Sequence, residues 1–194
     1  VAFAVVLAAV IQVIDMSIVN VAIPHMMGNF GASIDEVAWV STAYILASVI
    51  VIPMTGWLAG FFGRKRYFVA SILIFTAASF FCGAAGSLGS LVFWRVVQGV
   101  GGGALMATSQ AILYDTFPRE EAGTAMAMFG VGVMVGPTLG PTLGGWLTDN
   151  YSWPWIFYIN VPIGLAAAAM VAGFVHDRVP ALRRRIDYVG IALL

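Results

Sequence analysis

The sequence predicts an all-α membrane protein with a bundle of six transmembrane helices. Of its 194 residues, 61% are hydrophobic and only 9% are charged, whereas about 25% of the residues of a soluble domain are charged. Apolar stretches of the length that a helix needs to cross a bilayer, about 20 residues, recur six times. These stretches are continuous, rich in Ala and Leu, and lack the period-2 alternation of strands.

The six spans follow one another with short interruptions. They are expected over Val1–Pro24, Val37–Gly60, Tyr67–Leu88, Leu91–Tyr114, Ala122–Leu147 and Pro154–Val175. Polar or glycine-containing connections separate them, in order Gly31–Glu36, Gly63–Arg66, Gly86–Ser90, Pro118–Glu121 and Asp149–Trp153. Because such short connections cannot cross back over the membrane, consecutive spans are expected to be antiparallel.

The organisation of the chain follows from these spans. Residues 1–175 are expected to form the six-helix bundle. Residues 176–188 contain Pro180 and three consecutive arginines, which is typical of a linker that lies against anionic headgroups on the cytoplasmic side. Residues 189–194 begin a seventh apolar stretch. Because the sequence starts at Val1 and ends inside that stretch, we expect it to be a fragment of a longer protein.

The basic residues predict the orientation. One of the nine, Arg95, lies inside a span; the others all follow even-numbered spans, namely Arg64, Lys65, Arg66, Arg119, Arg178, Arg183, Arg184 and Arg185. Cytoplasmic connections carry the excess of Lys and Arg, so the N-terminus is expected in the cytoplasm. The net charge of zero gives no indication of nucleic-acid binding. The single cysteine excludes an intrachain disulfide and a cysteine-based metal cluster.

The first span carries a polar face. Gln12, Asp15 and Asn20 fall within an arc of about 140° on a helix. A charge at mid-membrane costs about 2.5–3.5 kcal/mol and usually faces a cavity or the protein interior. Because a dry environment disfavours the charged form of a carboxyl group, Asp15 is suited to proton coupling or cation recognition. A structural ion pair and an interhelical hydrogen bond are the alternatives.

The fourth span carries Arg95 near its outer end, where a long side chain can extend toward the interface. Gln98 lies on the same face, and Gly99 and residues 101–103 follow. Arg95 is expected either to hold a carboxylate or water chain whose protonation changes, or to act as a packing anchor. We expect Asp15 and Arg95 to line a water-filled crevice. The glycines loosely fit a dinucleotide fingerprint, but no strand precedes them, so this interpretation is excluded.

The fifth span combines glycines and prolines. Gly136, Gly140 and Gly144 are spaced by four residues and therefore share one face, on which another helix can pack closely. Pro137 and Pro141 each remove a backbone donor and favour a kink, and Gly145 follows. The pattern predicts a hinge or gating surface, with ordinary helix packing as the alternative.

Several stretches resemble the major facilitator superfamily, specifically its fourteen-span EmrB/QacA-type drug:H⁺ antiporters. They are Asp15–Pro24, Arg95–Gly103, Gly136–Gly145, Trp153–Gly164 and Arg183–Gly190. The resemblance implies the N-terminal bundle of such a transporter, built from two inverted three-helix repeats, with the first and fourth spans in corresponding positions. It also implies that Arg95 and Gln98 belong to a motif tied to proton transfer.

The loop after the second span departs from the family pattern. Gly60 stands where the family usually has an acid, and Phe61 where it has an arginine. A charge relay credited to this loop is therefore in doubt. A tight turn that keeps the cytoplasmic side closed is still expected from Gly63, Arg64 and Lys65.

The sequence and the resemblance together predict a proton-coupled multidrug exporter in a bacterial inner membrane. Its partners would be small-molecule drugs or toxic compounds, lipid and, by resemblance only, a periplasmic adaptor and an outer-membrane channel. No cofactor beyond the proton gradient, no metal and no nucleic acid is expected. A uniporter or importer of the same fold and a non-transporting membrane scaffold are the alternatives. A membrane enzyme is disfavoured because the spans contain no His/Asp/Glu cluster or Ser–His pair.

Overall fold

The computed structural model describes residues 1–118 and 120–175. In these residues it has the helices α1 (Ala2–Phe30), α2 (Ile34–Phe62), α3 (Arg64–Gly83), α4 (Leu88–Thr116), α5 (Ala122–Asn150), α6 (Trp155–Tyr158) and α7 (Asn160–Phe174). Together α6 and α7 make the sixth of six stretches long and apolar enough to span a membrane. The six predicted spans are therefore confirmed. The predicted linker (176–188) and the start of a seventh span (189–194) lie outside the described residues.

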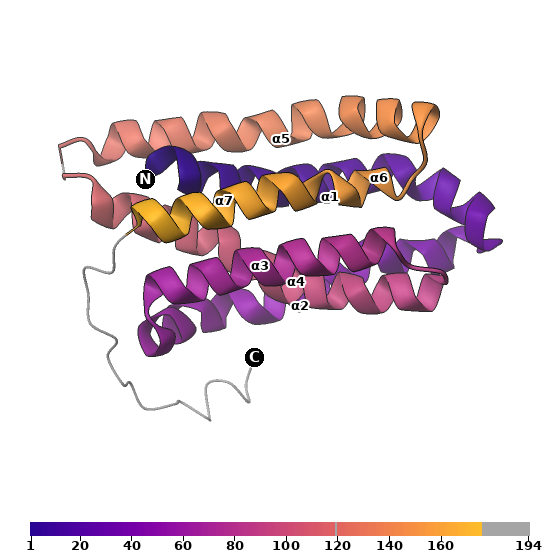
Figure 1. Cartoon of the computed structure of the whole chain (residues 1–194), viewed down its shortest axis with the longest axis horizontal. Coiled ribbons are helices and arrows are strands. Elements are labelled where there is room, and N and C mark those ends of the chain that lie inside the picture. Colours follow the sequence, from indigo (N-terminus) through magenta and orange to yellow (C-terminus); the bar gives the residue numbers. More distant parts are fainter. Residues whose placement is uncertain (119, 176–194) are drawn as a thin grey trace.

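The packing of the helices has an internal two-fold pattern. Figure 1 shows α5 beside α1 along one edge of the bundle, and α2, α3 and α4 grouped at the other, with α7 between. If the first, second and third spans correspond to the fourth, fifth and sixth, the contact of α1 with α5 corresponds to the contact of α4 with α2. Both contacts are extensive. The α1–α4 and α3–α7 contacts map onto themselves. This pattern is the one expected of two inverted repeats.

Several predicted helix boundaries are wrong in an instructive way. The first helix was expected to end at Pro24, but α1 continues through this proline to Phe30. It is capped by Gly31, whose φ of 60° places it in the left-handed region. A proline removes one backbone donor without stopping a helix that is packed along its length. The second helix begins earlier than Val37, because Ser33 and Glu36 form a capping box.

The connection between α2 and α3 is a single residue. Gly63 has φ 88° and ψ 137°, a conformation essentially reserved for glycine. The expected loop over Gly63–Arg66 is therefore too long, because Arg64 to Arg66 already form the first turn of α3. The basic side chains thus project from a helix end at the surface of the bundle.

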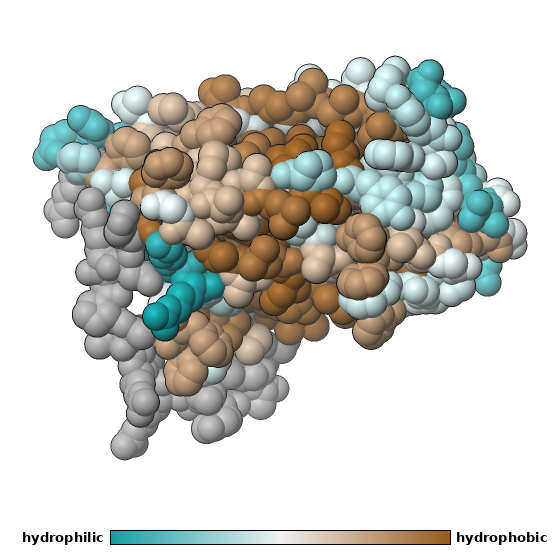
Figure 2. All heavy atoms as spheres, in the orientation of Figure 1, coloured by the Kyte–Doolittle hydropathy of each residue, from teal (hydrophilic) through white to brown (hydrophobic). Residues whose placement is uncertain are grey.

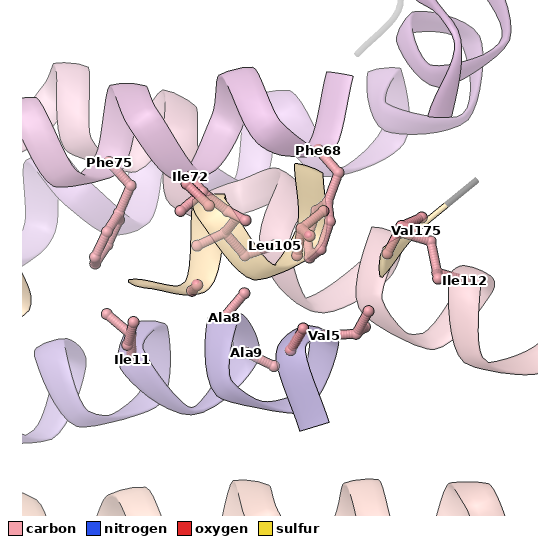
Figure 3. Close-up of a cluster of buried hydrophobic side chains, with 14 of the residues drawn as sticks. Val5, Ala8, Ala9, Ile11, Phe68, Ile72, Phe75, Leu105, Ile112 and Val175 are labelled. Atoms are coloured by element: carbon pink, nitrogen blue, oxygen red, sulfur yellow. The ribbon is translucent and has the colours of Figure 1, made fainter. Parts of the chain in front are cut away.

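The interior and the surface both suit a lipid environment. In one core cluster, Val5, Ala8 and Ile11 of α1 face α3 residues such as Phe68 and Phe75 (Figure 3). Figure 2 shows hydrophobic residues around the middle of the bundle and hydrophilic ones gathered at its two ends. Large apolar side chains are also exposed on the outside, as expected where the solvent is a bilayer.

Candidate functional site

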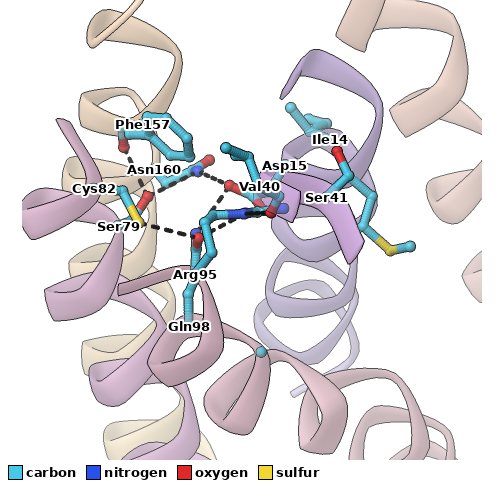
Figure 4. A network of polar contacts seen from close by, with 12 residues as sticks. Ile14, Asp15, Val40, Ser41, Ser79, Cys82, Arg95, Gln98, Phe157 and Asn160 are labelled. Atoms are coloured by element: carbon cyan, nitrogen blue, oxygen red, sulfur yellow. Dashed lines mark hydrogen bonds and ion pairs between the residues drawn. The ribbon is translucent and has the colours of Figure 1, made fainter. Parts of the chain in front are cut away.

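Asp15 lies in the middle of α1 and is completely buried (0% exposed). Its carboxylate accepts three hydrogen bonds from side chains of two other helices. Arg95 Nη1 donates to Oδ2 at 2.6 Å, while Gln98 Nε2 and Asn160 Nδ2 both donate to Oδ1 at 2.9 Å. Figure 4 shows these side chains converging from α1, α4 and the α6–α7 junction. All three contacts are donations to the carboxylate, so the arrangement matches its negatively charged form.

Arg95 is buried as deeply as Asp15, with 1% of its surface exposed. Besides the carboxylate, its guanidinium donates to Val40 O at 3.0 Å and to Gln98 Oε1 at 2.7 Å. The guanidinium carbon lies 4.2 Å from the centre of the Tyr44 ring and 5.8 Å from that of Phe157, within the range of cation–π attraction. The arginine therefore keeps favourable partners that do not depend on Asp15.

Two expectations about these charges are wrong. Arg95 does not extend to the interface, and the pair does not line a water-filled crevice within this bundle. The burial of both residues is produced by this bundle alone. The reason is that each charge supplies the other's counter-charge, and a buried ion pair is tolerated when further hydrogen bonds satisfy its remaining groups. The structure shows an ion pair between helices, and proton coupling through Asp15 stays a prediction.

The other two polar residues predicted on α1 have different surroundings. Gln12 is buried, and its Oε1 has no hydrogen-bond partner. It lies next to the Tyr44 hydroxyl, which also lacks a partner with good geometry. Asn20 is exposed and bonds weakly to Ser41 at 3.4 Å. Gln12 therefore adjoins the ion-pair network, whereas Asn20 does not belong to it.

Sequence reasoning missed three members of the network, namely Asn160, Ser79 and Cys82, whose Sγ lies 3.7 Å from Gln98 Oε1. Asn160 is 1% exposed and Ser79 is 0% exposed, and Asn160 Nδ2 donates to Ser79 Oγ at 3.1 Å. Ser79 in turn donates to the backbone carbonyl of Phe157 at 3.0 Å. The signal for Asn160 was present, since it is the one amide side chain in the predicted sixth span. Small hydroxyl residues such as Ser79 are too common in membrane helices to stand out.

The predicted closing residues lie at the end of the bundle where α2 meets α3. Gly63 forms the tight turn, and Arg64 at the start of α3 forms a salt bridge with Asp115 near the end of α4. Lys65 follows in the first turn of α3. Gly60 has open space around it and Phe61 stacks on Trp57. A tie between α3 and α4 thus exists at this end, and a role in closing the transporter stays a prediction.

The fifth-span glycines pack as predicted. A Cβ added to Gly136 would lie 2.6 Å from Val13 Cγ1, and one added to Gly144 would lie 2.8 Å from Ile18 Cγ1. Gly140, between them, faces Ser17. All three therefore seat α5 on the segment of α1 that carries Asp15. Pro137 and Pro141 are exposed, and Gly145 has open space around it. The helix is continuous, and the hinge stays a prediction.

A bundle of six membrane-spanning helices with this two-fold packing, and with opposite charges buried on corresponding first and fourth spans, has the architecture of one half of a secondary transporter. The profile of the Major Facilitator Superfamily matches residues 5–190. The chain belongs to the major facilitator superfamily, and it is a multi-pass membrane protein.

The chain is similar to several curated exporters. It is 44% identical over 189 residues to the multidrug export protein EmrB of Escherichia coli K12, covering 97% of this chain and 37% of that protein. It is 43% identical to the multidrug resistance protein B homologue of Mycobacterium tuberculosis H37Rv, covering 97% of this chain and 35% of that protein. The chain thus spans little more than a third of the length of these relatives.

Solved structures show the same fold at low identity. The inward-open xylose transporter XylE from E. coli superposes with a TM-score of 0.79 at 13% identity, over 93% of this chain and 47% of that one. A bacterial homologue of the human lysosomal transporter Spinster gives a TM-score of 0.75 at 18% identity, over 92% of this chain and 44% of that one.

Proposed function

We propose that the full-length protein is a multidrug efflux transporter that exports amphipathic or apolar compounds in exchange for protons. The names of its relatives, the multidrug export protein EmrB and the multidrug resistance protein B homologue, support the substrate class. The proton gradient is the driving force that we propose. Alternating access would proceed by rocking of this bundle against a second bundle outside the sequence.

The observation that carries the proposal is that Arg95 has several contacts besides its ion pair with Asp15. If Asp15 takes a proton, the guanidinium keeps the carbonyl of Val40, the amide oxygen of Gln98 and two aromatic faces. Leaving a buried charge without partners normally costs about 3–5 kcal/mol. These contacts would reduce that cost, which supports the proposal that Asp15 exchanges a proton.

The proposed cycle couples this protonation to export. A substrate enters from the cytoplasm while Asp15 is charged. A proton from the outside then neutralises the carboxylate, the substrate leaves, and the proton is released inward. Because both charges are buried within the bundle, access to Asp15 requires helices to move. The membrane potential contributes about 2.3 kcal/mol per charge per 100 mV, so inward movement of at least one net charge can drive uphill export.

We further propose the cytoplasmic (inner) membrane as the location, with a cytoplasmic N-terminus. The cluster of basic residues in the first turn of α3 supports this orientation. A periplasmic adaptor and an outer-membrane channel are proposed on resemblance alone. Cysteines placed at Ser87, which caps the start of α4, and at Glu120, in the connection between α4 and α5, are expected to react with an impermeant maleimide from the outside and the inside of the cell, respectively. Labelling of both from one side would refute the orientation.

The exchange itself is tested by the substitution Asp15→Asn. In proteoliposomes that contain the full-length protein, ethidium is expected to release protons from the wild type. The Asp15→Asn variant is expected to lose this release almost entirely, because an amide cannot carry the exchanged proton. Asp35→Asn, the same change at an exposed position in the first turn of α2, is the matched control and should behave like the wild type. Full proton release from the Asp15→Asn variant would contradict antiport through this residue.

A further inference from the structure

Asn160 is the contact through which the sixth span reaches the buried carboxylate. Its Nδ2 donates to Asp15 Oδ1 at 2.9 Å and to Ser79 Oγ at 3.1 Å. The Ser79 hydroxyl in turn donates a hydrogen bond to Phe157 O at 3.0 Å. The carboxylate on α1 is thereby linked through α7 and α3 to the backbone of α6, as the dashed lines in Figure 4 show.

The backbone around Asn160 is interrupted. The helical pattern stops at Ile159, between α6 and α7, although the backbone angles of this residue remain right-handed helical. Pro162 accounts for the interruption, because its ring nitrogen has no hydrogen to donate to the carbonyl of Tyr158, four residues earlier. Asn160 therefore stands at the start of α7, and Ser79 donates to the nearby carbonyl of Phe157, which also accepts the N–H of Ile159.

The two amides that contact Asp15 differ in their freedom to turn. The carbonyl oxygen of Gln98 accepts a hydrogen bond from Arg95 at 2.7 Å, so turning this amide would place its NH₂ group against a cation. Within the described part of the chain, the amide of Asn160 contacts no cation. When Asp15 is protonated, both of its partners, Asp15 and Ser79, carry hydroxyl groups that can either donate or accept, so this amide can turn. Of these two amides, only that of Asn160 can therefore turn when Asp15 becomes protonated.

We propose that Asn160 is a positioning residue that turns its amide when Asp15 takes a proton, and so reports the protonation state to the sixth span. This rests on the proposed function. When a proton from the aqueous phase binds Oδ1, the amide rotates by half a turn and its carbonyl oxygen accepts the new Asp15 O–H. Ser79 then re-aims its hydroxyl hydrogen from Phe157 O to the same amide oxygen. The carbonyl of Phe157 loses this donor, and the hydrogen bond between Ser79 of α3 and the backbone of α6 breaks.

The ionisable side chains around Asp15 come from three elements. Arg95 of α4 pairs with it directly, and Tyr44 of α2 and Cys82 of α3 interact with it electrostatically. Among the described residues, α7 contributes Asn160 without a charge of its own. The substitution Asn160→Leu therefore changes the hydrogen bonds of the carboxylate while the charges around it stay the same.

Infrared difference spectroscopy of the full-length protein during a pH titration tests the proposal. Protonated Asp15 is identified by the carboxyl C=O band that disappears in Asp15→Asn. In Asn160→Leu, the proton affinity of Asp15 is expected to rise about tenfold, because the charged form loses a stronger hydrogen bond than the neutral form does. The band should also move to higher frequency, because the O–H group has lost its amide acceptor.

Two further variants keep the test decisive. Ser79→Ala should raise the proton affinity by less, since it removes the acceptor that orients the Asn160 amide, and this variant carries the test if Asn160→Leu does not fold. Thr76→Val also removes a buried hydroxyl from the α3–α7 interface, but this hydroxyl bonds to Ile72 O of its own helix; the variant should titrate like the wild type.

The outcomes separate this inference from the proposed function. An Asp15 band that titrates with unchanged affinity and frequency in Asn160→Leu and Ser79→Ala overturns the role of Asn160 and leaves the antiport proposal standing. Equal shifts in Thr76→Val would show that general loosening of the interface is the cause, and would also overturn it. A wild-type protein in which no Asp15 band appears at any pH refutes both proposals together.

Discussion

The substitution Arg95→Met is expected to lower the free energy of unfolding by about 3–5 kcal/mol, because it leaves the Asp15 carboxylate buried without its counter-charge. Methionine fills a similar volume, so the loss reports the charge and its hydrogen bonds more than the packing. The measurement is unfolding of the full-length protein by SDS in mixed micelles. Proton release driven by ethidium should be lost in the same variant.

A charge-neutral double variant separates the two effects. Asp15→Asn combined with Arg95→Met removes both charges and should recover most of the lost stability, since replacing a whole buried pair is often neutral. Proton release should remain absent. Arg64→Met, which breaks the partly exposed pair with Asp115, should cost less than about 1 kcal/mol. A double variant as unstable as Arg95→Met alone would show that the pair is not the source of the loss.

The double substitution Gly99→Ala and Gly103→Ala is expected to lower the free energy of unfolding by roughly 2–5 kcal/mol through overpacking. An added Cβ would lie 2.5 Å from Tyr44 O at the first position and 2.7 Å from Ser48 O at the second. Both obstacles are backbone atoms of α2, so the helices must separate. Because Tyr44 lies over the Arg95 guanidinium, transport should fall as well.

Gly89→Ala is the matched control in the same helix. A Cβ at this position meets nothing within 4 Å, so stability should stay the same or rise slightly, as alanine favours helix. The same SDS unfolding assay compares the variants. A double variant as stable as Gly89→Ala would mean that α2 and α4 have room to spare, contrary to the close approach described above.

The spans and their order were predictable, because bilayer thickness and hydropathy determine them almost independently of tertiary contacts. The ends of the helices were less so. Pro24 looked like a terminus, yet the segment around it is held by packing, and the true end depends on the left-handed conformation of Gly31. The close-packing role of Gly136 was also readable, since spacing by four residues places glycines on one face.

The geometry of the site was only partly predictable. Composition singled out Asp15 and Arg95 as costly charges, but it could not show that they would contact each other, because 80 residues separate them in the chain. Sequence periodicity placed Asn20 on the same face as Asp15, whereas the neighbouring helices cover only Asp15. Asn160 belongs to the family-like stretch Trp153–Gly164, but the sequence assigned it no role, because its partner Asp15 on α1 lies far from it in the chain.

The 80-residue separation between the two charges has a consequence for synthesis. When α1 first enters the bilayer, α4 has not yet been made, and Asp15 has no cation to neutralise it. Of the six spans α1 is the most hydrophobic and α4 the least. The apolar side chains of α1 therefore offset the cost of inserting Asp15 until α4 has been made. The insertion of Arg95 then depends on Asp15, which is already in the membrane. Substitutions that make α1 less hydrophobic should therefore harm biogenesis before they harm transport.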